Sequence, residues 1–174
     1  MRTSPTGGVF WRNVPEGRDA LLETDFRTST DCRALTYDDG EIDCAAPDPP
    51  RMHSPGGSAR KVHTTFYRRY RNNGIGIETA KKYREAALSL YEDAGIEAYR
   101  VLRYRGALVK RRQDEFWSNR RRFPRVEILR ACEQLGFIAK NLFFVVRWHR
   151  PGVSRAVRQA RARMNHSQCL IFWK

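Results

Sequence analysis

The sequence has few cysteines, and their spacing excludes the common cysteine-based sites. Four of the 174 residues are cysteines, at Cys32, Cys44, Cys132 and Cys169. Their separations match neither a zinc ligand set nor a haem attachment motif. So few cysteines in a chain of this length are not typical of a disulfide framework. Cys132, which falls on an apolar helical pattern, is instead predicted to pack in the core.

Long hydrophobic runs are also missing. The longest one, Leu142 to Val146, lies between Lys140 and Arg147. It is far shorter than the roughly 20 apolar residues that a transmembrane helix requires. We therefore expect no transmembrane segment.

Motifs of the common enzyme classes are absent. The chain has no phosphate-binding loop of the Walker type, no dinucleotide fingerprint and no HExxH zinc motif. Adjacent acids such as Glu92 and Asp93 point in different directions on a helix. The histidines have no nucleophile at a motif spacing; they are His53, His63, His149 and His166. The sequence therefore predicts a protein that is not an enzyme, with no metal site and no cofactor of its own.

Positive charge is unevenly distributed along the chain. The formal charge is +14, from 33 Lys and Arg against 19 Asp and Glu. Residues 1–50 contain 5 Arg and 10 acids, a net of −5, whereas residues 51–174 contain 28 basic residues and 9 acids, a net of +19. Such a basic region indicates an acidic partner, for which nucleic acid, an anionic membrane surface and an acidic protein are all suitable.

The composition divides the chain into three parts. Residues 1–62 are rich in Pro, Gly, Ser, Thr and Asp, which predicts an extended N-terminal tail, with a small β-hairpin as the alternative. Residues 63–152 carry helical patterns and are predicted to form the folded domain. Residues 153–174 begin with a basic stretch and end on the apolar run Leu170 to Trp173. This part is predicted to be a C-terminal extension whose tip needs a surface to cover it.

Three helices are predicted from apolar residues that recur every three or four positions. They span about 78–93, 96–119 and 124–150. Gly95 is a suitable stop for the first helix, and Pro124 suits the first turn of the third. The predicted fold is therefore mainly α. Because short connections favour antiparallel neighbours, it is a three-helix antiparallel bundle with a long irregular N-terminal tail and a basic C-terminal extension.

Several residues in this region resemble the LYR-motif family of mitochondrial accessory and assembly proteins. Tyr83 and Arg84 match two letters of the family's Leu-Tyr-Arg triplet early in the first helix, with Lys82 in place of the leucine. A basic run and an F-x-x-N pattern follow, formed by Lys110, Arg111, Arg112, Phe116 and Asn119. Pro124-Arg125-Val126 then opens the third helix, as in the matrix-arm LYR accessory subunit of respiratory complex I. The similarity covers roughly residues 76–150.

The resemblance implies an accessory, non-catalytic subunit of mitochondrial respiratory complex I, on the matrix side of the inner membrane. Its implied partners are the acidic acyl carrier protein and neighbouring subunits of a large complex. The eight residues from Lys82 to Asn119 named above would contact the carrier, whose acyl-phosphopantetheine arm would enter between the helices. The acyl chain would be lined by Leu90, Leu102, Val109, Leu129 and Leu142. An ordinary packed core is the alternative for this apolar stripe.

RNA binding is the alternative function that the residues leave open. Aromatic and basic residues alternate between Phe66 and Arg71, a pattern that suits base stacking and phosphate contact. A basic chain with an irregular tail is also typical of a mitochondrial (organellar) ribosomal protein that binds ribosomal RNA. A scaffold subunit without a ligand is the third reading.

Overall fold

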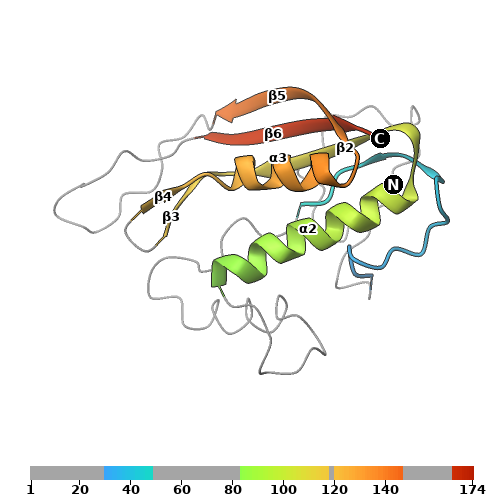
Figure 1. Cartoon of the computed structure of the whole chain (residues 1–174), viewed down its shortest axis with the longest axis horizontal. Helices are drawn as coiled ribbons and strands as arrows, with labels where there is room; N and C mark the ends of the chain where they lie inside the picture. The colour runs from blue at the N-terminus through green and yellow to red at the C-terminus, as the bar shows by residue number, and fades with distance from the viewer. Residues whose placement is uncertain (1–29, 49–82, 118–119, 147–165) are drawn as a thin grey trace, which may run out of the picture.

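The structure, a computed structural model, describes residues 30–48, 83–117, 120–146 and 166–174. These ranges have a mixed α/β fold (Figure 1). The elements in chain order are β1 (Ile42–Ala45), α2 (Tyr83–Val101), β2 (Leu102–Arg112), β3 (Glu115–Trp117), β4 (Arg120–Arg122), α3 (Pro124–Gln134), β5 (Ile138–Val146) and β6 (His166–Trp173).

The main sheet has four strands in the order β1-β2-β6-β5, and β3 and β4 form a separate hairpin. β1 and β2 are parallel, whereas β6 runs antiparallel to both β2 and β5. β2 and β5 therefore point the same way and are joined by a crossover through α3, with β6 inserted between them. As a result, the carboxyl ends of β1, β2 and β5 face one edge of the sheet, where the β3-β4 hairpin also projects (Figure 1).

Helices α2 and α3 pack next to each other on the same side of the sheet (Figure 1). Every second residue of β2 from Gly106 to Arg112 is buried beneath them. Cys132 is buried, as predicted. The core between the helices and the sheet is formed by Tyr91, Ala98, Leu102, Leu108, Ile128, Cys132, Phe137, Leu170 and Phe172.

The predicted helix over residues 96–119 is wrong. α2 continues through Gly95 to Val101, and β2 begins at the next residue. Burial then alternates along β2, which is the period of a strand. Gly95 does not end the helix, and a Cβ there would make only ordinary contacts, the nearest at 3.4 Å from Leu135 Cδ1.

The predicted third helix begins correctly at Pro124 but ends at Gln134 instead of near residue 150. Gly136 has a φ of +98°. The amide of Gly136 donates to the Glu133 carbonyl at 3.0 Å, and that of Phe137 donates to the Cys132 carbonyl at 3.1 Å. This pair of bonds is the Schellman motif that ends a helix at a glycine. Beyond it, residues 138–146 form β5, whose aromatic and β-branched side chains suit a strand.

The mainly α three-helix bundle is therefore wrong. The described residues contain two α-helices and a four-stranded sheet. β1 comes from the predicted N-terminal tail and β6 from the predicted C-terminal extension, so the run Leu170 to Trp173 is enclosed between β2 and β5. Residues 1–29, 49–82 and 147–165, which include most of the predicted tail, lie outside the described residues. Neither described helix is long and apolar enough to cross a membrane.

Candidate functional site at the carboxyl edge of the sheet

Several polar groups lie at the carboxyl edge of the main sheet. In open α/β sheets, ligands bind in the crevice beyond the carboxyl ends of the strands. Asp48 follows β1 closely, and Gln113 and Asp114 directly follow β2. α2 and α3 both begin at this edge and run back along the sheet, and β6 starts there at His166 (Figure 1). Within the described ranges, no three potential metal ligands lie together.

The segment that leads into β1 is held against α2 by Arg100. Its guanidinium donates to the carbonyls of Leu35 at 3.1 Å and Tyr37 at 2.9 Å. Glu97 accepts a hydrogen bond from the Leu35 amide at 2.7 Å. The Arg100 guanidinium also donates to Glu97 at 2.7 Å and lowers the pKa of that carboxyl. These contacts orient the chain that enters β1, and so they position the strand that Asp48 follows.

Two basic side chains of β2 are completely buried beneath α2, those of Lys110 and Arg112. Lys110 donates to the Tyr91 carbonyl at 2.8 Å. The Lys110 ammonium lies 5.7 Å and the Arg112 guanidinium 5.0 Å from the centre of the Tyr91 ring. Burial lowers the pKa of Lys110 to about 8. The ring offsets part of the cost of desolvating both cations.

Acidic and amide groups surround the end of β2. Arg112 donates to Glu115 at 3.3 Å. Asp114, which is buried, pairs with Arg125 at the start of α3. We assign the buried Gln168 amide so that its nitrogen donates to the Arg112 carbonyl at 2.8 Å and its oxygen accepts from Arg125 at 3.2 Å. This orientation is chosen because it satisfies both amide atoms, whereas the reverse one gives a bond of 3.3 Å to Asp114. The network ties β2, α3 and β6 together at the carboxyl edge.

The residues assigned to carrier binding do not form one surface. Lys110 and Arg112 are buried, whereas Arg111 points to the opposite face of the sheet, where it donates to Ser167 at 3.1 Å. The alternation of the strand separates neighbours that the helical prediction grouped. Of the remaining five, Tyr83 and Arg84 begin α2, Phe116 lies in β3, and Lys82 and Asn119 lie outside the described residues.

The five residues predicted to line an acyl chain are separated too. Leu102 is buried in the core and Leu129 packs against it, whereas Leu142 on β5 is 45% exposed. Leu90 is half-buried in α2. Val109 lies between the core-facing residues of β2, so it points to the other face of the sheet. These positions do not surround a common cavity.

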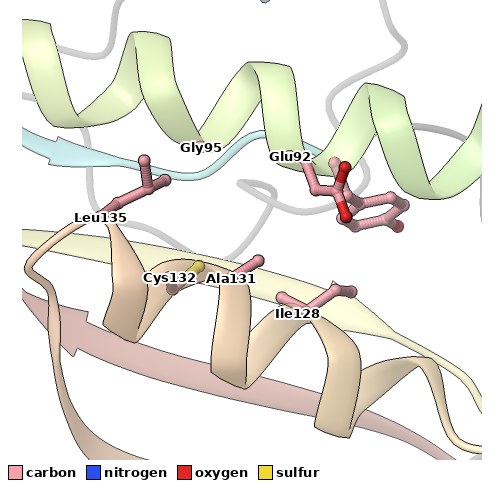
Figure 2. Close-up of a pocket in the computed structure, with 7 residues that line it drawn as sticks. Glu92, Gly95, Ile128, Ala131, Cys132 and Leu135 are labelled. Atoms are coloured by element: carbon pink, nitrogen blue, oxygen red, sulfur yellow. The ribbon is translucent and has the colours of Figure 1, made fainter.

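A small cavity does lie between α2 and α3. Figure 2 shows Ile128, Ala131 and Cys132 of α3 facing Glu92 and Gly95 of α2 across it. Its volume is about 10 Å³, which is roughly the space of one water molecule. An acyl chain does not fit there.

The fold resembles a set of solved structures. No protein-family model and no curated protein matches the chain. Three structures of TTHA0409, a candidate DNA modification methylase from Thermus thermophilus, do resemble it. They are a selenomethionine derivative, TTHA0409 itself, and its complex with S-adenosyl-L-methionine. Their TM-scores are 0.50, 0.51 and 0.51, and their identities are 19%, 20% and 21%. The alignments cover 83% of this chain and 50%, 52% and 53% of TTHA0409.

At this low identity the likeness shows the fold and not the activity. The chain spans about half the length of TTHA0409. The α/β sheet and the absence of a matching family model overturn the assignment to the LYR-motif family. The complex I subunit and its acyl carrier partner are overturned with it, and nothing supports the ribosomal RNA-binding alternative. The expectation of a non-enzymatic protein finds no support either, because the similar structures are those of a candidate methylase.

Sequence reasoning missed Asp48, Asp114 and Gln168. The run from Pro47 to Pro50 suggests only turn chemistry when it is considered alone. An available signal was that it closely follows a short segment, Ile42 to Ala45, in which only Asp43 is charged. Asp114 and Gln168 are 54 residues apart, and no local pattern connects them.

Proposed function

We propose that this chain is the base-binding part of a DNA-modification methylase, with its site at the carboxyl edge of the sheet. The observation that carries the proposal is Asp48, an exposed residue that follows β1 at the edge where open α/β sheets bind ligands. The likeness to TTHA0409 supports it. Because the chain spans about half of that protein, the activity of a whole methylase is part of the proposal.

Asp48 has the chemistry to hold the exocyclic amino group of a base. An ionised carboxylate only accepts hydrogen bonds, and the next two residues, Pro49 and Pro50, have no amide hydrogen to donate. Adenine N6 and cytosine N4 are the amino donors that DNA presents in the major groove, and guanine N2 is the one in the minor groove. A segment of acceptors therefore favours an amino group over a carbonyl oxygen. Accepting its hydrogens also makes the nitrogen a better nucleophile.

DNA suits the charge at this edge. β4 consists of Arg120, Arg121 and Arg122, of which the first two are exposed. The β3-β4 hairpin projects from the carboxyl edge (Figure 1), so Arg120 and Arg121 are exposed where phosphates would approach. Phosphate contacts position a protein on DNA without reading its sequence. Chemistry on a base requires that the base leave the duplex stack. The hairpin thus suits contact with the DNA backbone, and Asp48 suits contact with a base.

S-adenosyl-L-methionine, which one TTHA0409 structure contains, is a donor of electrophilic methyl groups. Neither of the two cavities described for this chain offers it a place at this edge. The cavity between α2 and α3 holds about 10 Å³, and a larger depression lies at the opposite edge, beside Tyr104 and Trp173. We therefore assign the described residues to base and phosphate binding alone.

Transfer of a radioactive methyl group from S-adenosyl-L-methionine to DNA by the full chain tests the proposal, with the cofactor held by residues other than those assigned here to base and phosphate binding. We expect the label on N6 of adenine or N4 of cytosine after digestion to nucleosides. Asp48→Asn removes the charge and introduces a donor, so labelling should fall at least about a hundredfold, which corresponds to about 2.7 kcal/mol. Asp38→Asn, at an exposed aspartate before β1, is the matched control and should leave labelling unchanged.

Other outcomes would contradict parts of this proposal. Equal labelling by Asp48→Asn would remove the role of that carboxylate, and a label on C5 of cytosine would exclude amino-group chemistry. A wild-type protein that neither labels nor binds DNA would refute the proposal as a whole.

Charge reversal at Arg120 and Arg121 should weaken binding to all DNA sequences alike, with a shallower salt dependence. The mitochondrial localisation stays a prediction.

A further inference from the structure

A second region with the character of a binding site lies at the amino edge of the main sheet. There α2 ends, β2 and β5 begin, and β6 ends. An open depression at this edge has a volume of about 720 Å³, within the range of roughly 300–1,000 Å³ that is typical of ligand sites. Its lining includes three aromatic and two cationic side chains, those of Tyr99, Tyr104, Trp173, Arg105 and Lys174.

Each of these aromatic rings has a cation close to it. The Lys174 ammonium lies 4.7 Å from the centre of the Tyr99 ring, and the Arg105 guanidinium lies 5.6 Å from that of Tyr104. Lys140, on β5, lies 4.6 Å from the centre of the Trp173 ring. Tyr104 is 78% exposed and Trp173 is 46% exposed, so a planar ligand has access to both rings. Aromatic platforms beside positive charges match the two parts of a nucleotide, its base and its phosphate.

The backbone at Arg105 is held in a conformation that L-residues seldom adopt. Arg105 has a φ of +63°, whereas all other described residues with positive φ are glycines. Its amide donates to the Lys174 carbonyl at 2.9 Å, and the Lys174 amide donates to the Gly106 carbonyl at 3.0 Å. Residues in such strained conformations persist where their surroundings enforce them, and they cluster at functional sites. An arginine at a position that suits glycine indicates a functional role for its side chain.

We propose that the amino-edge depression binds single-stranded nucleic acid. Bases stack on Tyr104 and Trp173, while Arg105, Lys174 and Lys140 contact the phosphates. A single strand is favoured because its bases expose their faces, whereas a duplex encloses them. Among the described aromatic pairs, none includes Tyr104 or Trp173, whereas Tyr99 packs on Phe137.

This site is separate from the one at the carboxyl edge. β2 joins the two edges with 11 residues, which span roughly 35 Å at about 3.3 Å per residue. The proposal therefore does not depend on the proposed methylase function. Its test measures binding, and changes at Asp48 should leave that binding unaffected.

Fluorescence anisotropy of a short labelled single-stranded deoxyoligonucleotide, titrated with the full chain, tests the proposal. Tyr104→Ala should raise the Kd about tenfold, since stacking of one base contributes on the order of a tenfold change in affinity or more. Arg105→Gly should weaken binding and reduce the slope of log affinity against log salt by about 0.7, the value for one phosphate contact on a single strand. Glycine adopts the positive φ without strain, so this variant should remain folded.

Matched controls keep the test specific. Arg103→Ala removes the same charge from a neighbouring residue that pairs with Asp43 instead of lining the depression. Phe143→Ala removes an exposed ring from β5. Both should change the Kd less than about twofold. The proposal is overturned if Tyr104→Ala and Arg105→Gly bind like the wild type, if both controls weaken binding as strongly, or if polyglutamate competes as well as the oligonucleotide does.

Discussion

Lys110 offers a direct test of the burial that separates this fold from the predicted bundle. In the bundle it would be an exposed contact for a partner, whereas in the structure it is completely buried beneath α2. Its pKa falls from 10.5 to about 8 because burial disfavours the charged form. At about 1.4 kcal/mol for each pKa unit, keeping this lysine protonated costs the folded state roughly 3 kcal/mol.

The sign of the pH dependence follows from the lowered pKa. Below pH 8 the lysine is protonated in both the folded and the unfolded chain, and the full cost is present. Between about pH 8 and 10.5 the folded chain has lost the proton while the unfolded chain still binds it, so the free energy of unfolding rises with pH. Above pH 10.5 both states are neutral and the rise ends.

Lys110→Met removes this titration with little other change. Methionine is an unbranched apolar side chain that suits the space of a buried lysine stem. The Tyr91 carbonyl, which accepts from Lys110 at 2.8 Å, lies inside α2 and keeps its helical hydrogen bond. We therefore expect the variant to be at least as stable as the wild type at pH 7. The stability of the wild type relative to the variant should then rise by roughly 3 kcal/mol between pH 8 and 10.5.

Urea denaturation of both proteins over that pH range measures the difference. Burial raises the pKa of the nearby Cys132 to about 11, so its thiol ionises first in the unfolded chain and lowers stability as pH rises. Because this thiol is present in both proteins, its effect largely cancels in the comparison, and a Cys132→Ala background removes it from both. If the difference in stability between the two proteins stays constant from pH 7 to 10.5, the pKa of Lys110 is not lowered and its burial is refuted.

Three further changes probe backbone strain and the carboxyl-edge network. Arg105→Gly should stabilise the fold by roughly 0.5–1 kcal/mol in thermal denaturation, because relief of positive-φ strain exceeds the entropy that glycine adds to the unfolded chain; a destabilised variant would mean that the conformation is not strained. Gly136→Ala should destabilise by about 1–3 kcal/mol, since φ is +98° and a Cβ would meet Tyr99 Oη at 3.0 Å; an unchanged urea midpoint would contradict this. Arg125→Ala should destabilise by about 2–3 kcal/mol, because it leaves the carboxylate of Asp114 buried without its cation. Adding Asp114→Ala should restore part of that loss, and simple additivity in the double-mutant cycle would argue against the pair.

Local patterns predicted several features of the chain correctly. The helical start at Pro124 was predictable because proline suits a first turn without needing an amide hydrogen. The burial of Cys132 followed from the apolar period around it. These features depend on residues within a turn or two of each other, so a sequence window contains all the information they require.

The strands were not predictable in the same way. Residues 102–112 fit a helical period as well as a strand period, because apolar residues recur there at spacings of two and of three or four. The strand is stabilised by β1 on one side and β6 on the other, and β6 lies more than fifty residues away in sequence. Strand preference reflects packing against such distant partners more than an intrinsic backbone preference. Gly136 was the exception, a local helix stop that the long apolar stripe concealed.

The sequence by itself determined the charge asymmetry and the local helix signals. Only the tertiary structure decided that Lys110 and Arg112 are buried, that Asp114 meets Arg125, and that Asp48 follows a strand at the carboxyl edge. The reason is that composition and short-range periodicity belong to the chain, whereas burial and pairing are set by segments that meet only when the sheet assembles.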